Sequence, residues 1–191
     1  RMTDLAVGAD GRNRTMLSAF AAKTGRNQPS NSKFIFGPSR WLRSLIKPPA
    51  GHGFVYCDFA NQEIGIAAAL SGDPGLIAGY KAGDPYMDFG YRSGYVPETA
   101  TKETHPIERQ LLKGTVLGIG YGMQEHTLAG RLGITPLEAK NLIRRHQEAY
   151  PVFWEWSDGI CDRAMLTSQL STELGWTLTL DAKSAINPRS L

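Results

Sequence analysis

Residues 53–70 place three kinds of sequence in immediate succession: an apolar run, a carboxylate and an Ala-rich stretch. The apolar run, Gly53-Phe54-Val55-Tyr56-Cys57, predicts a buried β-strand over residues 53–59, with Asp58 at its exit. A charge at the end of a core strand is costly unless a cation meets it, so a divalent metal is a natural partner for Asp58. The Ala-rich stretch predicts a helix from Gln62 to about Leu70.

A second pattern lies further along the chain. Thr104-His105-Pro106 is a helix-start signal, and it predicts a helix that runs to about Gly120. A set of side chains recurs along it at every fourth position: Arg109, Lys113, Leu117 and Tyr121. Such a set forms a stripe about 120° wide and roughly 18 Å long. Together with a metal-binding carboxylate at Asp58, a cationic helix that ends in an aromatic ring suits a magnesium-triphosphate substrate.

Glycines are frequent in and just after this helix. Gly114, Gly118, Gly120 and Gly122 each cost about 1 kcal/mol relative to Ala in a helix interior. The close approach of a nucleotide, together with a helix that must swing, would explain why they are tolerated. The alternative is a buried packing helix notched by glycine.

The bulk properties are those of an ordinary soluble protein. The chain has 191 residues, of which 41% are hydrophobic and 20% charged, enough for one domain or a little more. No apolar run approaches the roughly 20 residues that a membrane span needs. The first residues have no signal-peptide pattern, and Cys57 and Cys161 have no metal or redox spacing. We therefore expect a cytoplasmic protein without a membrane partner, in which Cys57 is a buried thiol.

Charge is distributed unevenly along the chain, whose net charge is +3. Residues 1–50 hold nine basic residues against two acids, and the remaining 141 residues hold 12 bases against 16 acids. Aromatic residues such as Phe34 and Trp41 are interleaved with the bases. This pattern is typical of a surface that binds a nucleic-acid backbone, although a solvated basic face would give it too.

Turn and helix signals divide the rest of the chain. Residues 1–50 predict short strands and turns, with one helical stretch near Met16–Lys23. The other expected elements are helices over about Pro74–Ala82, from Asp84-Pro85, over Pro136–Tyr150 and over Val152–Leu166, a loop over 91–103, and a strand or hairpin arm over Leu174–Leu180. The histidines His52, His105, His126 and His146 have no paired spacing and are expected to be surface or capping residues.

Three segments carry a family resemblance: Asp58-Phe59-Ala60-Asn61-Gln62-Glu63 with Ser71-Gly72-Asp73 beyond it, the helix Arg109–Met123, and Thr24-Gly25-Arg26. Together they resemble family A DNA polymerases. The resemblance implies an α+β fold: a partial palm with a short antiparallel sheet, and a helical fingers subdomain. Residues 1–191 would then be a fragment of a polymerase domain, with palm over about 1–90, fingers over about 91–170 and the return to the palm over about 171–191.

The resemblance assigns roles to two acids. Asp58 would bind both catalytic magnesium ions, with help from the backbone carbonyl of Phe59, which agrees with the need of Mg²⁺ for hard oxygen ligands. Glu63 would crowd the ribose 2′ position and so select deoxynucleotides. The alternative is that Asp58 caps the following helix and Glu63 is merely exposed. Asn61, Gln62 and Gly65, which lie around Glu63, depart from the usual family pattern.

The resemblance also assigns the nucleotide and DNA contacts. Arg109 and the catalytic Lys113 would hold the triphosphate, and Leu117 and Tyr121 would shape the base-pair pocket; Leu117 stands where an aromatic residue is usual. Arg26 and Thr24 would contact the primer-template DNA. Lys33, Arg40 and Arg43 are weaker candidates for that role. The step Asp84-Pro85-Tyr86 resembles a family Asp-Ile-His step, with Tyr86 in place of the histidine.

One family feature has no counterpart in this sequence. The second metal-binding Asp of the family follows a His, and no His-Asp pair occurs here. A single carboxylate cannot clamp two metal ions, so this chain alone should be inactive or nearly so. We expect a fragment of a DNA-templated DNA polymerase for replication or repair, which uses dNTPs and Mg²⁺. The alternatives are half of a split polymerase completed by a second polypeptide, or an inactive DNA- or nucleotide-binding remnant. A single-subunit RNA polymerase relative shares the fold, but Glu63 argues against it.

Overall fold

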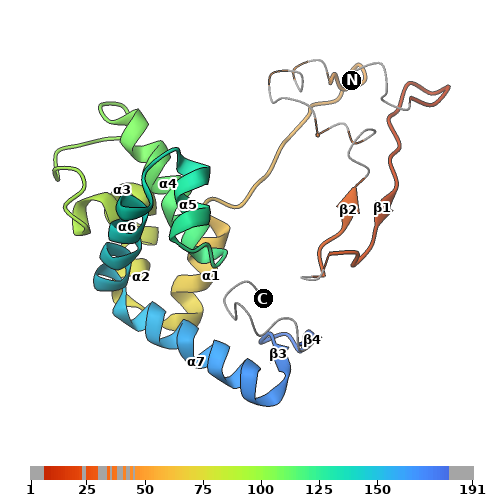
Figure 1. Ribbon diagram of the computed structural model, residues 1–191. Helices are drawn as coiled ribbons and strands as arrows, with labels where there is room; N and C mark the ends of the chain where they lie inside the picture. The colour runs from red at the N-terminus through yellow and green to blue at the C-terminus, as the bar shows by residue number, and fades with distance from the viewer. Residues whose placement is uncertain are drawn as a thin grey trace. The chain divides into compact units, whose positions relative to one another are not determined.

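The computed structural model describes residues 7–22, 25–29, 34, 36–37, 41, 44 and 46–180. The chain divides into two units, Arg1–Asp58 and Phe59–Leu191, each of which is described by itself. The described residues of the first contain little regular structure, and those of the second are mostly helical (Figure 1). The described residues thus combine helices with small antiparallel sheets, which confirms the predicted α+β class.

The N-terminal unit contains one short hairpin-like pair of strands. β1 (Leu17–Ser18) pairs antiparallel with β2 (Gln28–Pro29), and Leu17 lies opposite Pro29. The helix predicted near Met16–Lys23 is therefore wrong over the described residues 16–22. Phe20 has a φ of 55°, in the left-handed region, which a right-handed helix cannot accommodate.

The strand predicted over residues 53–59 is also wrong. The backbone of 53–58 forms no strand, and its side chains are exposed, with Val55 80% exposed. Cys57 is exposed as well, which corrects the expectation of a buried thiol. A β-strand needs a neighbour for its N–H and C=O groups, and no strand among the described residues pairs with this segment. An apolar run alone does not provide that neighbour.

The helical unit is built from consecutive helices that are joined by short connections, except for the longer loop over residues 93–105 between the third and fourth (Figure 1). In chain order they are α1 (Gln62–Ser71), α2 (Pro74–Lys81), α3 (Pro85–Arg92), α4 (Pro106–Gly120), α5 (Glu125–Leu132), α6 (Pro136–Ala149) and α7 (Pro151–Thr167). The predicted helices match α1, α2, α3, α4, α6 and α7 to within a few residues. α5 was not predicted. The predicted hairpin arm is β4 (Thr177–Thr179), which pairs antiparallel with β3 (Gln169–Ser171).

Proline and side-chain caps explain where most of these helices begin. α2, α3, α4, α6 and α7 each have a proline in the first turn, where its missing N–H costs nothing. Asp84 caps α3 by accepting a hydrogen bond from the Met87 N–H at 3.3 Å. At α6, Thr135 and Glu138 form a reciprocal capping box. These local signals are encoded in the sequence, and for that reason the helix starts were predictable.

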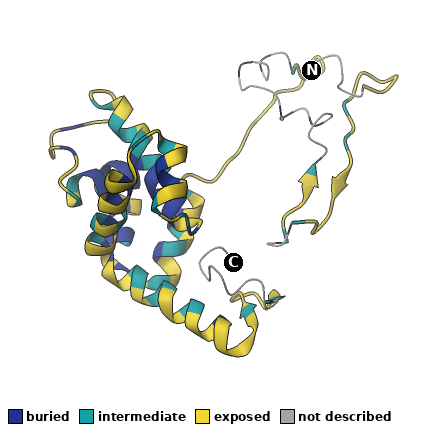
Figure 2. Ribbon diagram, in the orientation of Figure 1, coloured by how far each residue is buried: buried dark blue, intermediate teal, exposed yellow. Residues whose placement is uncertain are grey.

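Two groups of buried side chains hold the helices together, and both lie where the helices meet (Figure 2). The larger joins α1, α2, α3 and α4, and its buried members include Ile64, Leu76, Met87, Phe89, Leu112 and Tyr150. The smaller joins α4, α5 and α6 through Ile119, Leu128, Ala129 and Ala139. α4 contributes to both groups, so it is the central helix of the unit. Within the part of the chain that the structure describes, no helix has the length and apolar character to cross a membrane.

A buried carboxylate joins the starts of two helices. Asp73, only 1% exposed, caps α2: its Oδ1 accepts the N–H groups of Gly75 and Leu76 at 2.8 and 3.0 Å. Its Oδ2 accepts the N–H of Phe153, in the first turn of α7, at 3.0 Å. Both helix starts carry positive partial charge and unsatisfied N–H groups, which offset the cost of burying the anion. Asp73 thereby fixes α7 beside α2.

His146 on α6 is buried, which corrects the prediction that it is a surface or capping residue. Its ring is 2% exposed and packs against Phe89, Tyr150 and Phe153, with ring centroids 5.2, 4.9 and 5.9 Å away. The indole Nε1–H of Trp154 donates to its Nδ1 at 2.9 Å. Burial lowers the pKa of His146 from 6.5 to about 3, an effect that the charge of Asp73 partly opposes. The ring is therefore neutral in the folded protein at neutral pH.

We predict that Asp73→Ala lowers the free energy of unfolding by about 2–4 kcal/mol, because a helix cap is lost and a buried backbone donor loses its acceptor. Thr135→Ala, which removes an exposed cap from α6, is the matched control and should cost about 1 kcal/mol. Urea unfolding measures both values. Equal losses of unfolding free energy in the two variants would show that the hydrogen bond from the Phe153 N–H to Asp73 adds nothing to stability.

The pH dependence of stability tests the environment of His146. Because its pKa is lower in the folded state, the unfolded chain takes up the proton first as the pH falls. Stability from this residue is therefore complete above pH 6.5 and is lost toward pH 3, by about 1.4 kcal/mol per pH unit. His146→Asn keeps an acceptor for Trp154 but does not titrate. Unfolding at pH 7, 6 and 5 should show a shallower loss in this variant than in the wild type, and parallel curves would contradict the assignment.

Candidate functional site

α4 has two distinct faces. Leu112, Val116 and Ile119 are buried in the core. On the predicted stripe, Arg109, Lys113 and Leu117 are half-buried and Tyr121 is 54% exposed. The stripe therefore lies toward the edge of the core. The polar groups of its side chains can reach solvent there, while the parts nearer the backbone are packed.

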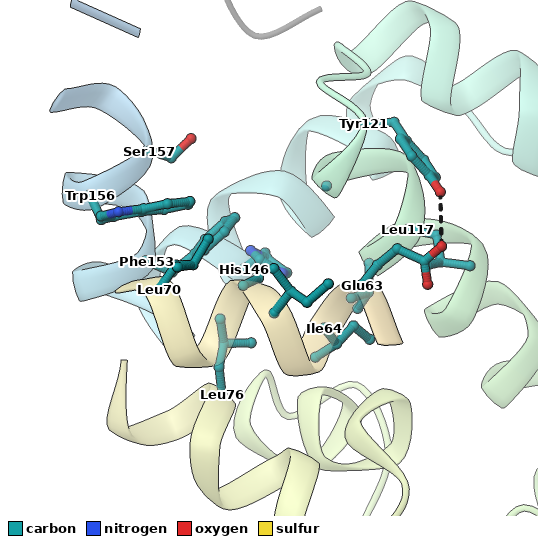
Figure 3. Close-up of a pocket in the computed structure, with 14 residues that line it drawn as sticks. Glu63, Ile64, Leu70, Leu76, Leu117, Tyr121, His146, Phe153, Trp156 and Ser157 are labelled. Carbon is teal, nitrogen blue, oxygen red and sulfur yellow. Dashed lines mark hydrogen bonds between the residues drawn. The ribbon is translucent and has the colours of Figure 1, made fainter. Parts of the chain in front are cut away.

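The end of the stripe meets the start of α1. The hydroxyl of Tyr121 donates a hydrogen bond to Oε1 of Glu63 at 3.3 Å, and Figure 3 shows the two side chains facing each other beside Leu117. Glu63 lies in the first turn of α1, where the helix dipole favours a negative charge. Asn61, just before the helix, has a φ of 50°, and its side-chain amide donates to the carbonyl of Gly83 at 3.4 Å. The structure thus brings together three residues that the sequence analysis assigned to the nucleotide: Glu63, Leu117 and Tyr121.

The other end of the stripe meets the start of α3. Nε of Arg109 donates to Oδ2 of Asp84 at 2.6 Å, in an ion pair whose side chains are 28% and 25% exposed. The ring of Tyr86 lies beside both cations of the stripe: its centroid is 5.5 Å from Cζ of Arg109 and 5.6 Å from Nζ of Lys113. Burial, and next the charge of Glu63, raises the pKa of Tyr86, so its phenol is neutral at physiological pH. No role for Asp84 or Tyr86 at this site was predicted from the sequence.

A cavity of about 250 Å³ lies between α1, α4 and α7 (Figure 3). Glu63 and Tyr121 line it from one side and Phe153 and Trp156 from the other. The rest of the wall is mostly apolar and includes Ile64, Leu70, Leu76, Val116 and Leu117. An opening with apolar walls and a carboxylate at its edge can pack a flat apolar group while it holds a polar one.

Two glycines of α4 serve the packing of α5. A Cβ atom at Gly114 would lie 2.5 Å from Cδ2 of Leu132, and one at Gly118 would lie 2.7 Å from Cδ1 of Leu128. Gly122, just after the helix, has a φ of 72° and so occupies a conformation that favours glycine. The close neighbour of Gly114 and Gly118 is therefore a helix of the same unit, and this contact explains their presence without a nucleotide. Gly114 and Gly118 therefore fit the alternative interpretation, a buried packing helix notched by glycine.

The candidate metal ligands show how far the described residues provide a magnesium site. Asp58 and Phe59 are both exposed. A carboxylate and a backbone carbonyl are hard oxygen donors of the kind that Mg²⁺ prefers, but two donors do not complete its coordination. Among the described residues, no group of three or more His, Cys, Asp or Glu side chains could hold a metal ion.

The candidate DNA contacts belong to the N-terminal unit. Arg26 is exposed, and its backbone carbonyl accepts a hydrogen bond from the Ala22 N–H at 3.2 Å, which closes a turn at Gly25. Thr24, Lys33, Arg40 and Arg43 lie outside the described residues.

The fold has a counterpart among solved structures. The polymerase domain of Pol1 from M. smegmatis, solved in complex with a DNA primer-template and dNTP, superimposes with a TM-score of 0.78 over 99% of this chain and 34% of that one, at 24% sequence identity. The fold is thus that of part of a polymerase domain. The sequence matches the description "DNA polymerase family A" over residues 3–189. The chain belongs to DNA polymerase family A.

Curated relatives agree with this assignment. DNA polymerase I of Treponema pallidum is 24% identical over 184 residues, which cover 92% of this chain and 18% of the relative. The thermostable DNA polymerase I of Thermus thermophilus is 28% identical over 170 residues, or 86% of this chain and 20% of the relative. The DNA polymerase of Mycobacterium phage D29 is 28% identical over 153 residues, or 78% and 25%. The chain spans about a fifth of the length of the two bacterial relatives.

The packing of α4 against α5 gives a test with a built-in control. We predict that Gly118→Ala lowers the free energy of unfolding by about 1–3 kcal/mol, because fully buried Leu128 has no room to retreat. Gly130→Ala, on α5 with no atom within 4 Å of the new Cβ, should instead stabilise by up to about 1 kcal/mol through helix propensity. Thermal unfolding measures both changes. Stabilisation by Gly118→Ala would contradict the packing explanation.

Proposed function

We propose that this chain is the palm–fingers part of a DNA-templated DNA polymerase. In that reaction, the primer 3′-hydroxyl attacks the α-phosphate of a dNTP, the new P–O bond forms, and pyrophosphate leaves. One observation carries the proposal: the stripe on α4 begins at two cations and ends at a tyrosine that is hydrogen-bonded to Glu63 of α1. Family membership, and the primer-template DNA and dNTP bound by the M. smegmatis polymerase domain, support the same partners here.

The cations of the stripe bind the triphosphate in this proposal. Arg109 offers a planar fork of donors and Lys113 a point charge, and both suit phosphate oxygens. The bond from Nε of Arg109 to Asp84 occupies one of the five guanidinium N–H donors, so four remain for other acceptors. Arg109 and Lys113 would offset the negative charge that builds on the leaving pyrophosphate, which gives Lys113 its catalytic role.

The sugar and base bind toward the other end of the stripe. Glu63 places a carboxylate beside Tyr121, where it would exclude a ribose 2′-hydroxyl by its bulk. Leu117 and Tyr121 border the apolar cavity and would pack against the nascent base pair. An aliphatic residue at position 117 packs but does not stack, so we expect weaker base stacking there than an aromatic side chain would provide.

A magnesium site that includes Asp58 and the carbonyl of Phe59 completes the proposal. A bound magnesium ion would activate the attacking hydroxyl and neutralise phosphate charge. The remaining ligands would come from outside the residues described, either from a longer form of this chain or from a second polypeptide. The sequence contains no His-Asp pair, and this is the observation that favours the alternative, an inactive remnant that binds DNA or nucleotide.

The DNA contacts of the proposal lie on the basic N-terminal segment. Arg26, which is exposed, and Thr24 would contact the primer-template duplex, and the excess of bases over residues 1–50 would attract its phosphate backbone. The role would be in replication or repair in the cytoplasm.

Primer extension by the complete polypeptide that carries this chain tests the proposal. Asp58→Ala should reduce the extension rate at least about 100-fold, because the loss of a metal ligand removes several kcal/mol of transition-state stabilisation. Asp162→Ala, which removes another exposed carboxylate, should leave the rate unchanged. If Asp58→Ala extends primers at the wild-type rate, the proposal fails. DNA binding without any extension by the wild type would favour the inactive remnant.

A further inference from the structure

The start of α3 presents an anion and an aromatic ring to the cations of α4. Asp84 is the cap residue of α3, and Tyr86 lies in its first turn. Asp84 accepts two hydrogen bonds, one from the N–H of Met87 within its own helix and one from Nε of Arg109 on α4. A single short segment thus contacts the cationic end of the stripe through two different kinds of group.

Tyr86 is positioned as a platform beneath two positive charges. Its ring is 4% exposed, so it is packed firmly in the core. The distances from its centroid to Cζ of Arg109 and Nζ of Lys113, 5.5 and 5.6 Å, both lie within the range of about 6 Å in which a cation is attracted to a ring. The attraction arises from the negative face of the ring and does not require the hydroxyl group.

The arrangement solves a physical problem of the proposed nucleotide site. Two cations one helical turn apart repel each other, and their long side chains carry about 2 kcal/mol each of rotamer entropy. A fixed ring that attracts both charges offsets part of this repulsion and restricts both side chains before a ligand arrives. Binding a polyphosphate then costs less ordering of the protein.

We propose that Tyr86 is a positioning residue that holds Arg109 and Lys113 together for a polyphosphate ligand, while Asp84 anchors Arg109 through an ion pair. This inference rests on the proposed function, because it concerns the same triphosphate site. It adds a residue and a mechanism to that site: the aromatic face, and not the hydroxyl, of Tyr86 sets the positions of the cations.

A fluorination series separates this role from simple packing. Three variants of the chain replace Tyr86 by Phe, by 3,5-difluorophenylalanine or by 3,4,5-trifluorophenylalanine, and they are compared with the wild type. These rings have nearly the same shape, but each added fluorine weakens the negative face. Calorimetric titration with inorganic tripolyphosphate, in the absence of divalent metal, measures the binding of phosphate by the cations alone. The same replacements at Tyr91, also on α3, are the control.

We expect Tyr86→Phe to bind tripolyphosphate as the wild type does and the trifluorinated ring to bind about 3- to 10-fold more weakly, with the difluorinated ring between them. At position 91, the variant with 3,4,5-trifluorophenylalanine should bind tripolyphosphate with the same affinity as the Tyr91→Phe variant. Equal affinities across the series at position 86 would overturn the inference and leave the proposed function standing. If the wild-type chain does not bind tripolyphosphate, the proposed phosphate site fails together with the inference.

Discussion

The buried carboxylate of Asp73 determines how the helical unit is arranged. It accepts N–H groups from the first turns of both α2 and α7, and so it ties two helices that are far apart in the sequence. With α7 held in this way, Phe153 and Trp156 form one wall of the cavity whose other walls are α1 and α4. A neutral side chain could not satisfy these donors as well, because a carboxylate has two oxygens and the charge that both helix starts favour. This buried anion therefore helps to hold α7 against the candidate nucleotide site, together with the contacts of His146 with Phe153 and Trp154.

α4 connects this framework to the proposed chemistry. One face of the helix belongs to both buried clusters, while the stripe that carries Arg109 and Lys113 stays half-exposed. The cations are neither buried at the cost of desolvation nor free in solvent, because Asp84 and Tyr86 contact them from α3. Rigid helices thus support charged groups that can still meet a ligand from solvent.

The helices were predictable from the sequence because the signals for their starts are local. Proline in the first turn, and the capping box of Thr135 and Glu138, indicate where helices begin. α5 was missed because Gln124 precedes it without a side-chain cap, no proline lies in its first turn, and it lacks an Ala-rich stretch like the one that indicated α1. The strand at 53–59 failed for a different reason: a strand depends on a partner, which no local pattern provides. Burial of His146 could have been inferred, because Ala139 and Leu142 precede it by seven and four residues on the same helix face.

The candidate site was predictable to the extent that it follows from helix periodicity. Arg109, Lys113, Leu117 and Tyr121 share a face of one helix, and their spacing alone indicates this. Their partners are contributed by other helices. The hydrogen bond from Tyr121 to Glu63 joins residues separated by 58 positions, and the ion pair of Arg109 with Asp84 spans 25. Helix periodicity contains no signal for such contacts, and only the family resemblance had assigned Glu63 and Tyr121 to the same nucleotide.

A structure of the complete polypeptide with primer-template DNA and a non-hydrolysable dNTP analogue would show directly whether the stripe on α4 binds the triphosphate. We expect the triphosphate oxygens to contact the guanidinium of Arg109 and the ammonium of Lys113, with the sugar against Glu63. A triphosphate bound away from α4, with these three side chains in contact only with protein and solvent, would contradict this expectation.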